Sequence, residues 1–249
     1  MDRTKIDWCD STWNPVTGCL HGCEYCYARG IAERFGGKQK YANIFDESEP
    51  IKGSDGKALA YPHSFSPTFH RYRLNDYIGK QGRNIFVCSM ADLFGDWVPD
   101  SWIDEVFEAC EKAPQHNYLF LTKNPKRYEK ILDRYMPPNM WFGWSETGPM
   151  GNKCDFSTHH SIKTFISIEP LLEPFKEIHI RGVDWVIIGA ETGRRKDKVV
   201  PEKKWIEDIV NGCRKAEIPI FMKSSLTDIW GEPLIQEFPK ELRGKHHGK

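Results

Sequence analysis

The chain has 249 residues, 39% of them hydrophobic, and its 35 basic side chains balance its 35 acidic ones. This length and composition are those of a globular protein with a substantial core. Zero net charge argues against a protein that holds nucleic acid mainly through a broad positive field, although it leaves room for a local basic groove. No apolar run is long enough to span a membrane, and the first residues show no apolar signal region. We therefore expect a soluble cytoplasmic protein with no membrane partner.

Short apolar segments alternate with helical patterns from about residue 80 onward. Their near-continuous hydrophobicity is typical of strands that helices cover on both faces of a parallel sheet. The predicted strands span residues 85–88, 118–121, 140–144, 165–168, 185–188 and 218–222.

Three helices are predicted between these strands. Ser101 and Asp104 form a capping-box pattern before apolar residues at helical spacing. Asn124 followed by proline marks a second helix start, and apolar residues repeat with a helical period over residues 205–213. The βαβα order predicts a parallel sheet with right-handed crossovers. The length fits a complete or partial (β/α) barrel of the TIM type at least as well as an open doubly wound sheet.

The segment of residues 36–82 differs from the rest of the chain. It is rich in glycine, proline and serine turns and shows little periodicity, so we interpret it as an insertion between the first helix and the second strand. We expect one barrel domain over residues 1–240, followed by a basic tail over residues 241–249.

Polar residues follow each of the six predicted strands, where a parallel α/β architecture collects its chemistry. One polar residue after a strand is ordinary, but six in turn indicate a functional rim. Glu169 lies so close behind a buried strand that it needs a partner, such as Lys123, Lys223 or a ligand amine. We take these three residues as candidate catalytic residues.

The eight cysteines need an explanation other than disulfides, because a reducing compartment keeps thiols free. Cys19, Cys23 and Cys26 fall within eight residues, whereas the other five are scattered. Cys110 and Cys213 lie on apolar helical stripes, where a buried thiol acts as a small hydrophobic group.

The spacing of the three clustered cysteines lets one loop turn three sulfurs toward a common point. A structural zinc site normally needs a fourth ligand, and His21 lies at a spacing that matches no common zinc motif. Three thiolates with an open fourth position suit a [4Fe-4S] cluster that keeps one iron free for substrate or cofactor. Zinc is the alternative.

The pattern Cys-x3-Cys-x2-Cys, with Tyr25 before the third cysteine, resembles the signature of radical S-adenosylmethionine (SAM) enzymes. Over most of the chain, the sequence is similar to the phage-associated three-Cys-motif family of radical SAM-like proteins. The segments that carry this resemblance are residues 13–19, 23–28, 89–94, 167–172 and 189–193. Cys9 departs from the family pattern, where relatives tend to carry threonine, and we do not count it as a ligand.

The resemblance implies a partial (β/α) TIM-type barrel of the radical SAM kind, and it implies roles for particular residues. Cys19, Cys23 and Cys26 would ligate three irons, and the methionine part of SAM would chelate the fourth. The segment from Ser89 to Asp92 would bind the methionine amine. The remaining cofactor contacts would be Tyr25 near the adenine, Gly189 and Glu191 near the adenosine, and Ser145 or Glu146 near the ribose.

The substrate is inferred by association. Arg194, Arg195 and Lys196 follow a strand and suit phosphate contacts, although such runs are usually solvated surface. Because relatives occur in phages, we expect a nucleic-acid base or nucleotide to be modified or isomerised, with thymine hypermodification of phage DNA favoured and an external electron donor. The alternatives are a radical SAM enzyme acting on a peptide or small metabolite, and a non-catalytic zinc-stabilised nucleic-acid-binding protein.

Overall fold

The computed structural model describes residues 4–37, 43–131, 136–149, 162–175, 180–193, 195–231 and 233–243. Within these residues, no helix is long and apolar enough to cross a membrane.

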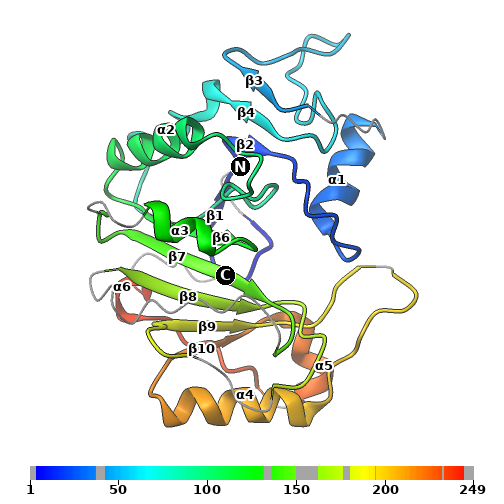
Figure 1. Ribbon diagram of the computed structural model, residues 1–249, viewed down its shortest axis with the longest axis vertical. Coiled ribbons are helices and arrows are strands. Elements are labelled where there is room, and N and C mark those ends of the chain that lie inside the picture. The colour runs from blue at the N-terminus through cyan, green and yellow to red at the C-terminus, as the bar shows by residue number, and fades with distance from the viewer. Residues whose placement is uncertain are drawn as a thin grey trace.

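The core of the fold is a seven-stranded parallel sheet whose strands follow chain order (Figure 1). This order has no reversal, so it distinguishes a curled, barrel-type sheet from a doubly wound one. Strands β1 and β10 lie at the two edges and do not pair with each other, which leaves the barrel partial, as predicted. The strands are β1 (Ser11–Trp13), β5 (Asn84–Val87), β6 (Asn117–Thr122), β7 (Met140–Glu146), β8 (Lys163–Ile168), β9 (Trp185–Ile188) and β10 (Ile220–Met222).

The three predicted helices are present and pack against the sheet. They are α2 (Asp100–Glu111), α3 (Lys126–Ile131) and α4 (Lys203–Lys215). The predicted capping box is wrong: α2 begins at Asp100, and its N-cap is Pro99, which makes no side-chain hydrogen bond to the helix. Proline fixes its own φ angle before the helix, and its carbonyl accepts a hydrogen bond of 3.1 Å from Trp102 N in the first turn. Short helices follow at α5 (Thr227–Trp230) and α6 (Lys240–Arg243), with 3₁₀ turns at Arg71–Arg73 and Ser224–Leu226.

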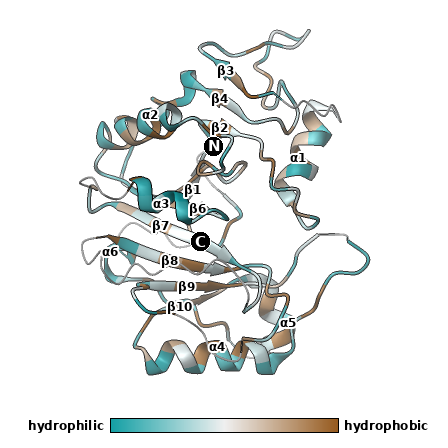
Figure 2. Ribbon diagram, in the orientation of Figure 1, coloured by the Kyte–Doolittle hydropathy of each residue, from teal (hydrophilic) through white to brown (hydrophobic). Residues whose placement is uncertain are grey.

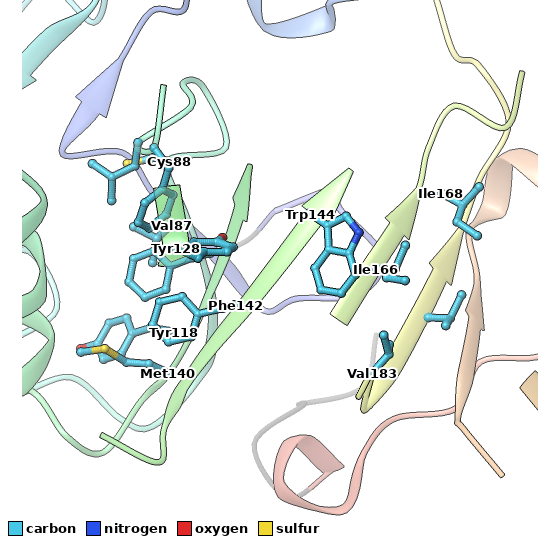
Figure 3. Packing of buried hydrophobic residues seen from close by; sticks show 14 of the residues in the cluster. Val87, Cys88, Tyr118, Tyr128, Met140, Phe142, Trp144, Ile166, Ile168 and Val183 are labelled. Carbon is cyan, nitrogen blue, oxygen red and sulfur yellow. The ribbon is translucent and has the colours of Figure 1, made fainter. Parts of the chain in front are cut away.

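Each strand from β5 to β10 is apolar on both faces, and the two faces enter different hydrophobic clusters. The outer cluster joins alternate strand residues such as Val87, Phe142 and Ile166 to the helices (Figure 3). The inner cluster fills the barrel with Phe86, Phe165 and their neighbours. Figure 2 shows the result: much of β8 to β10 is hydrophobic, whereas α4 mixes both kinds of residue.

A second, three-stranded sheet lies beside the barrel. It pairs β2 (Val16–Thr17) with β4 (Thr68–His70), and β4 with β3 (Phe45–Glu47). The segment read as an insertion after α1 (Tyr27–Gly36) therefore contributes two of the three strands. Inside this sheet, His70 is fully buried; its Nε2 lies 2.9 Å from Thr17 Oγ1, and its Nδ1 lies 2.9 Å from Glu47 Oε2.

The chain does not fray where the basic tail was expected to begin. Leu242 is fully buried against the inner cluster, and its carbonyl accepts a hydrogen bond of 2.9 Å from Asn84 Nδ2. Apolar contact and a long-range hydrogen bond therefore hold α6 on the barrel. Only residues 244–249 of the expected tail lie outside the described part of the chain.

Candidate active site at the strand carboxyl ends

The inward-facing residues of the barrel change from large and apolar to small or polar along each strand. In β7 the order is Trp141, Gly143 and Ser145, and in β8 and just past its end it is Phe165, Ser167 and Glu169. Since successive side chains alternate between faces, these residues point to the same side as the inner cluster. The filled barrel therefore opens into a cavity at the carboxyl ends of its strands.

The cavity has a volume of about 200 Å³, and every predicted strand end contributes to its wall. Its apolar floor is formed by Ile6, Trp8, Phe86 and Leu121, which belong to or pack on the inner cluster. Of the residues predicted from sequence, those that line it are Cys19, Cys23, Tyr25, Cys26, Ser89, Asp92, Lys123, Ser145, Glu169, Glu191 and Lys223.

Two predicted cofactor residues do not line the cavity. Glu146 accepts a hydrogen bond of 3.1 Å from Trp144 Nε1. Gly189 lies just behind the wall, where an added Cβ would be 3.0 Å from Lys223 Cδ and 3.3 Å from Glu169 Cδ. A side chain at this position would press on both residues, so glycine leaves them the space they occupy.

The three clustered cysteines lie on the loop that enters α1 and face the same cavity. Gly18 and Gly22 have backbone φ angles of 85° and 72°, which turn the loop around Cys19 and Cys23. Cys26 is the N-cap of α1, where its Sγ accepts a hydrogen bond of 3.3 Å from the Arg29 amide. The positive end of the helix dipole therefore points at the cysteine loop, which favours a negatively charged group there.

The clustered cysteines differ from the others in exposure. Cys19, Cys23 and Cys26 are half-buried, whereas Cys9, Cys88, Cys110 and Cys213 are buried. Burial raises the pKa of both Cys88 and Cys213 to about 12, so these thiols stay protonated at neutral pH. The predicted structural role of Cys110 and Cys213 fits this burial; Cys154 lies outside the described residues.

Burial and nearby Asp92 also raise the pKa of the Cys19 thiol, to about 12, against a smaller opposing effect of a backbone hydrogen bond. A metal or iron–sulfur cluster that binds here has to displace the thiol proton, which couples its binding to proton release.

Three contacts tie the cysteine loop to the strand ends across the cavity. His21 Nε2 lies 2.7 Å from Asp92 Oδ2. Lys123 Nζ lies 3.2 Å from the Tyr25 hydroxyl and also over its ring. Tyr27 donates a hydrogen bond of 2.6 Å to the Ser89 carbonyl. The loop is thus held on the sheet by partners far apart in the sequence.

Asp92, which the resemblance places at the methionine amine, is already hydrogen-bonded to four groups of the protein. Besides His21, its carboxylate accepts hydrogen bonds from Thr122 Oγ1 at 2.7 Å, Lys123 N at 2.9 Å and Phe94 N at 3.0 Å. A carboxylate has about four lone-pair positions, and these four partners occupy them. Asp92 is 5% exposed. Through its bonds to His21 and Thr122 it joins the cysteine loop to β6.

Glu191 is held by Arg195, one of the predicted phosphate contacts. The guanidinium forms two hydrogen bonds of 2.7 Å to the carboxylate, and a third atom lies 3.5 Å from Glu24 in the cysteine loop. The bond from Arg195 lowers the pKa of Glu191. Arg195 is therefore engaged by carboxylates, Lys196 is exposed, and Arg194 lies outside the described residues.

Sequence reasoning missed two features of the site. Trp8 closes the cavity floor, with its ring 4.7 Å from that of Phe86, because the N-terminal segment runs beneath the strand ends. Thr122 shares Asp92 with His21. The position of Thr122 directly after a predicted strand was the one available signal, whereas nothing local marks Trp8.

The fold and the site define a class: a partial (β/α) barrel with a three-cysteine loop facing a cavity at the carboxyl ends of its strands. More particularly, residues 3–247 match the family described as "Protein of unknown function (DUF5131)", and the chain belongs to that family. No curated protein matches the chain.

Three solved structures of spore photoproduct lyase are similar to the chain in outline. A double mutant with bound AdoMet and dinucleoside spore photoproduct is 10% identical, with a TM-score of 0.48 over 91% of this chain and 77% of that one. The lyase complexed with dinucleoside spore photoproduct is 13% identical, with a TM-score of 0.44 over 94% of this chain and 71% of that one. A cysteine-to-alanine mutant with the same dinucleoside is 11% identical, with a TM-score of 0.41 over 82% and 60%. The chain thus spans 60% to 77% of these proteins.

Proposed function

We propose that this protein is a radical SAM enzyme whose [4Fe-4S] cluster is held by Cys19, Cys23 and Cys26. One observation carries the proposal: three half-buried cysteines of a single loop face a cavity at the carboxyl ends of seven parallel strands. This is the edge at which barrels of this kind collect their chemistry.

The donor set fits a cluster better than a single zinc ion. Zinc requires its ligands to converge on one point. His21, the candidate for a fourth zinc ligand in this loop, has its Nε2 2.7 Å from Asp92 Oδ2. A cluster distributes its thiolates over separate irons, so they need not converge.

Residues of the cavity wall would hold and orient both the cluster and SAM. When bound, a reduced cluster would supply one electron for the cleavage of SAM to methionine and a 5′-deoxyadenosyl radical, which would take hydrogen from the substrate. The lining residues Tyr25, Ser89, Ser145 and Glu191 would contact SAM beside the cysteines. Asp92 would position the cysteine loop through His21.

The proposed substrate is a nucleic-acid base or nucleotide, modified or isomerised with an electron from an external donor. The apolar floor of the cavity suits the face of a flat ring. Lys196 and Lys198 are exposed beyond Glu191, where they can reach phosphates that remain outside the cavity.

The proposal is tested by SAM cleavage. Protein reconstituted anaerobically with iron and sulfide and then reduced with dithionite should form methionine and 5′-deoxyadenosine slowly without substrate, as measured by mass spectrometry. Cys23→Ala should abolish this reaction and Cys213→Ala, which removes a buried helical thiol, should preserve it. A cluster-loaded wild-type protein that binds SAM but never cleaves it would refute the proposed activity.

A further inference from the structure

Glu169 and Lys223 form an ion pair in the wall of the cavity. Lys223 Nζ donates a hydrogen bond to Glu169 Oε1. The Lys223 side chain is 17% exposed and the Glu169 side chain is 24% exposed. Both residues line the cavity, and Gly189 provides the space in which they meet. Neither residue belongs to the cysteine loop or to the proposed SAM contacts.

The charges of the cavity wall disfavour an anion at this depth. The wall holds three carboxylates, those of Asp92, Glu169 and Glu191, and two ammonium groups, those of Lys123 and Lys223, while the Arg195 guanidinium is bound to Glu191. No ammonium group is left over for a phosphate at Lys223, because a phosphate there would have to displace Glu169 and would then face that carboxylate. The cavity therefore favours an uncharged group over a phosphate.

The pair still offers hydrogen bonds to an uncharged ligand. An ammonium group has three N–H donors and a carboxylate about four acceptor positions, so one mutual bond leaves capacity on both. A free donor and a free acceptor lie side by side, above an apolar floor that includes Trp8, Phe86 and Leu121. A flat ring that carries a C=O group next to an N–H group matches both features.

We infer that the Glu169–Lys223 pair binds the hydrogen-bonding edge of a nucleobase that enters the cavity ring first. Lys223 donates to the ring carbonyl and Glu169 accepts from the adjacent ring N–H, while the phosphates stay outside. This inference rests on the proposed function, because it specifies which part of a nucleic acid the site recognises. It assigns a binding role to two residues that the sequence marked only as catalytic candidates.

The test uses single-stranded octanucleotides labelled with fluorescein and fluorescence anisotropy, so it does not require turnover. Oligothymidylate is compared with the same strand carrying N3-methylthymine, which lacks the ring N–H, and with an abasic strand. The double variant Glu169→Met/Lys223→Met removes the pair without leaving an isolated buried charge. The control Lys204→Met/Asp208→Met removes an ion pair on the surface of α4.

We expect wild-type protein to bind the thymine strand about tenfold more tightly than the N3-methyl strand, the effect of one unmet hydrogen bond. The Glu169/Lys223 double variant should bind both strands equally, and the Lys204/Asp208 control should discriminate like the wild type. The inference is wrong if wild-type protein does not discriminate, or if the double variant still does. It is also wrong if the double variant weakens binding of the abasic strand as strongly as that of the thymine strand, since the pair would then bind phosphate.

Failure of the inference and failure of the proposed function give different results. A protein that carries the cluster and cleaves SAM but does not discriminate between the strands refutes only the role of the pair. A protein that discriminates but never holds iron refutes only the radical SAM proposal. Loss of SAM affinity in the double variant, measured by equilibrium dialysis, with strand discrimination intact, would place the pair in the cofactor site and overturn the inference.

Discussion

Two glycines of the cysteine loop differ in what surrounds them, and this difference gives a quantitative prediction. Gly18 and Gly22 both have left-handed backbone angles, with φ of 85° and 72°. A Cβ added at Gly22 would meet nothing within 4 Å, whereas one at Gly18 would lie 2.1 Å from the Ser66 carbonyl oxygen. Gly22→Ala therefore tests the backbone angle alone, and Gly18→Ala tests the angle together with close packing.

The expected magnitudes follow from these surroundings. Alanine at a left-handed position costs about 1 kcal/mol, which is the whole effect expected for Gly22→Ala. Gly18→Ala has to separate two backbone segments, which adds about 1 to 3 kcal/mol of overpacking. It also weakens the hydrogen bonds from Gly18 N to Met90 O and from Cys19 N to Phe65 O, for a total of about 3 to 5 kcal/mol.

The assay is urea unfolding of the metal-free proteins, followed by iron analysis after anaerobic reconstitution. Gly18→Ala should lower the free energy of unfolding by the larger amount and lose most of its iron, because Cys19 moves with Gly18. Gly22→Ala should lose about 1 kcal/mol and keep its iron. Equal stability losses in the two variants would refute the close packing of the loop against residues 65–66.

Three further predictions concern His70, Asp92 and Lys196. Burial lowers the pKa of His70 to about 3, so the unfolded chain takes up a proton that the folded chain excludes, and this costs about 2 kcal/mol of stability from pH 7 to pH 5. The raised pKa of Glu47 offsets part of this cost, so urea titrations should show a net loss below about 2 kcal/mol, and a smaller one in His70→Gln. A wild-type protein whose stability does not change between pH 7 and pH 5 would contradict a buried, neutral His70. Asp92→Asn replaces an acceptor oxygen by an amide donor among four donating partners. We therefore expect about 2 to 3 kcal/mol of destabilisation and reduced iron retention. A variant that keeps its full iron but binds SAM more weakly would instead support a contact to the methionine amine. Lys196→Ala should reduce the salt dependence of DNA binding by about one phosphate contact; an unchanged slope in anisotropy titrations would exclude Lys196 from the interface.

Hydrophobic runs made the sheet predictable from sequence. Strands such as residues 185–188 are apolar on both faces, so they stand out against the polar helix surfaces. Strand β1 was not assigned a range, because Ser11–Trp13 is only three residues long and has no apolar run. The same two-sided hydrophobicity hid which residues face the barrel interior, and so the cavity could be located only at the strand ends in general.

The cysteine ligands were predictable because they are close together in the sequence, whereas their partners were not. His21 and Asp92 are 71 residues apart, and Glu169 and Lys223 are 54 apart. Such pairs form only once the barrel brings the strand ends together. Of the two lysines proposed as partners of Glu169, the structure places Lys223 beside it and Lys123 on Tyr25.

Iron and sulfide analysis of anaerobically reconstituted protein tests the central proposal most directly. The proposal predicts about four irons and four sulfides per chain, with a brown colour. Alanine at Cys19, Cys23 or Cys26 should abolish them, while Cys110→Ala and Cys213→Ala should keep them, because those two thiols are buried on helices away from the cavity. One zinc ion per chain, with no iron after reconstitution, would contradict it.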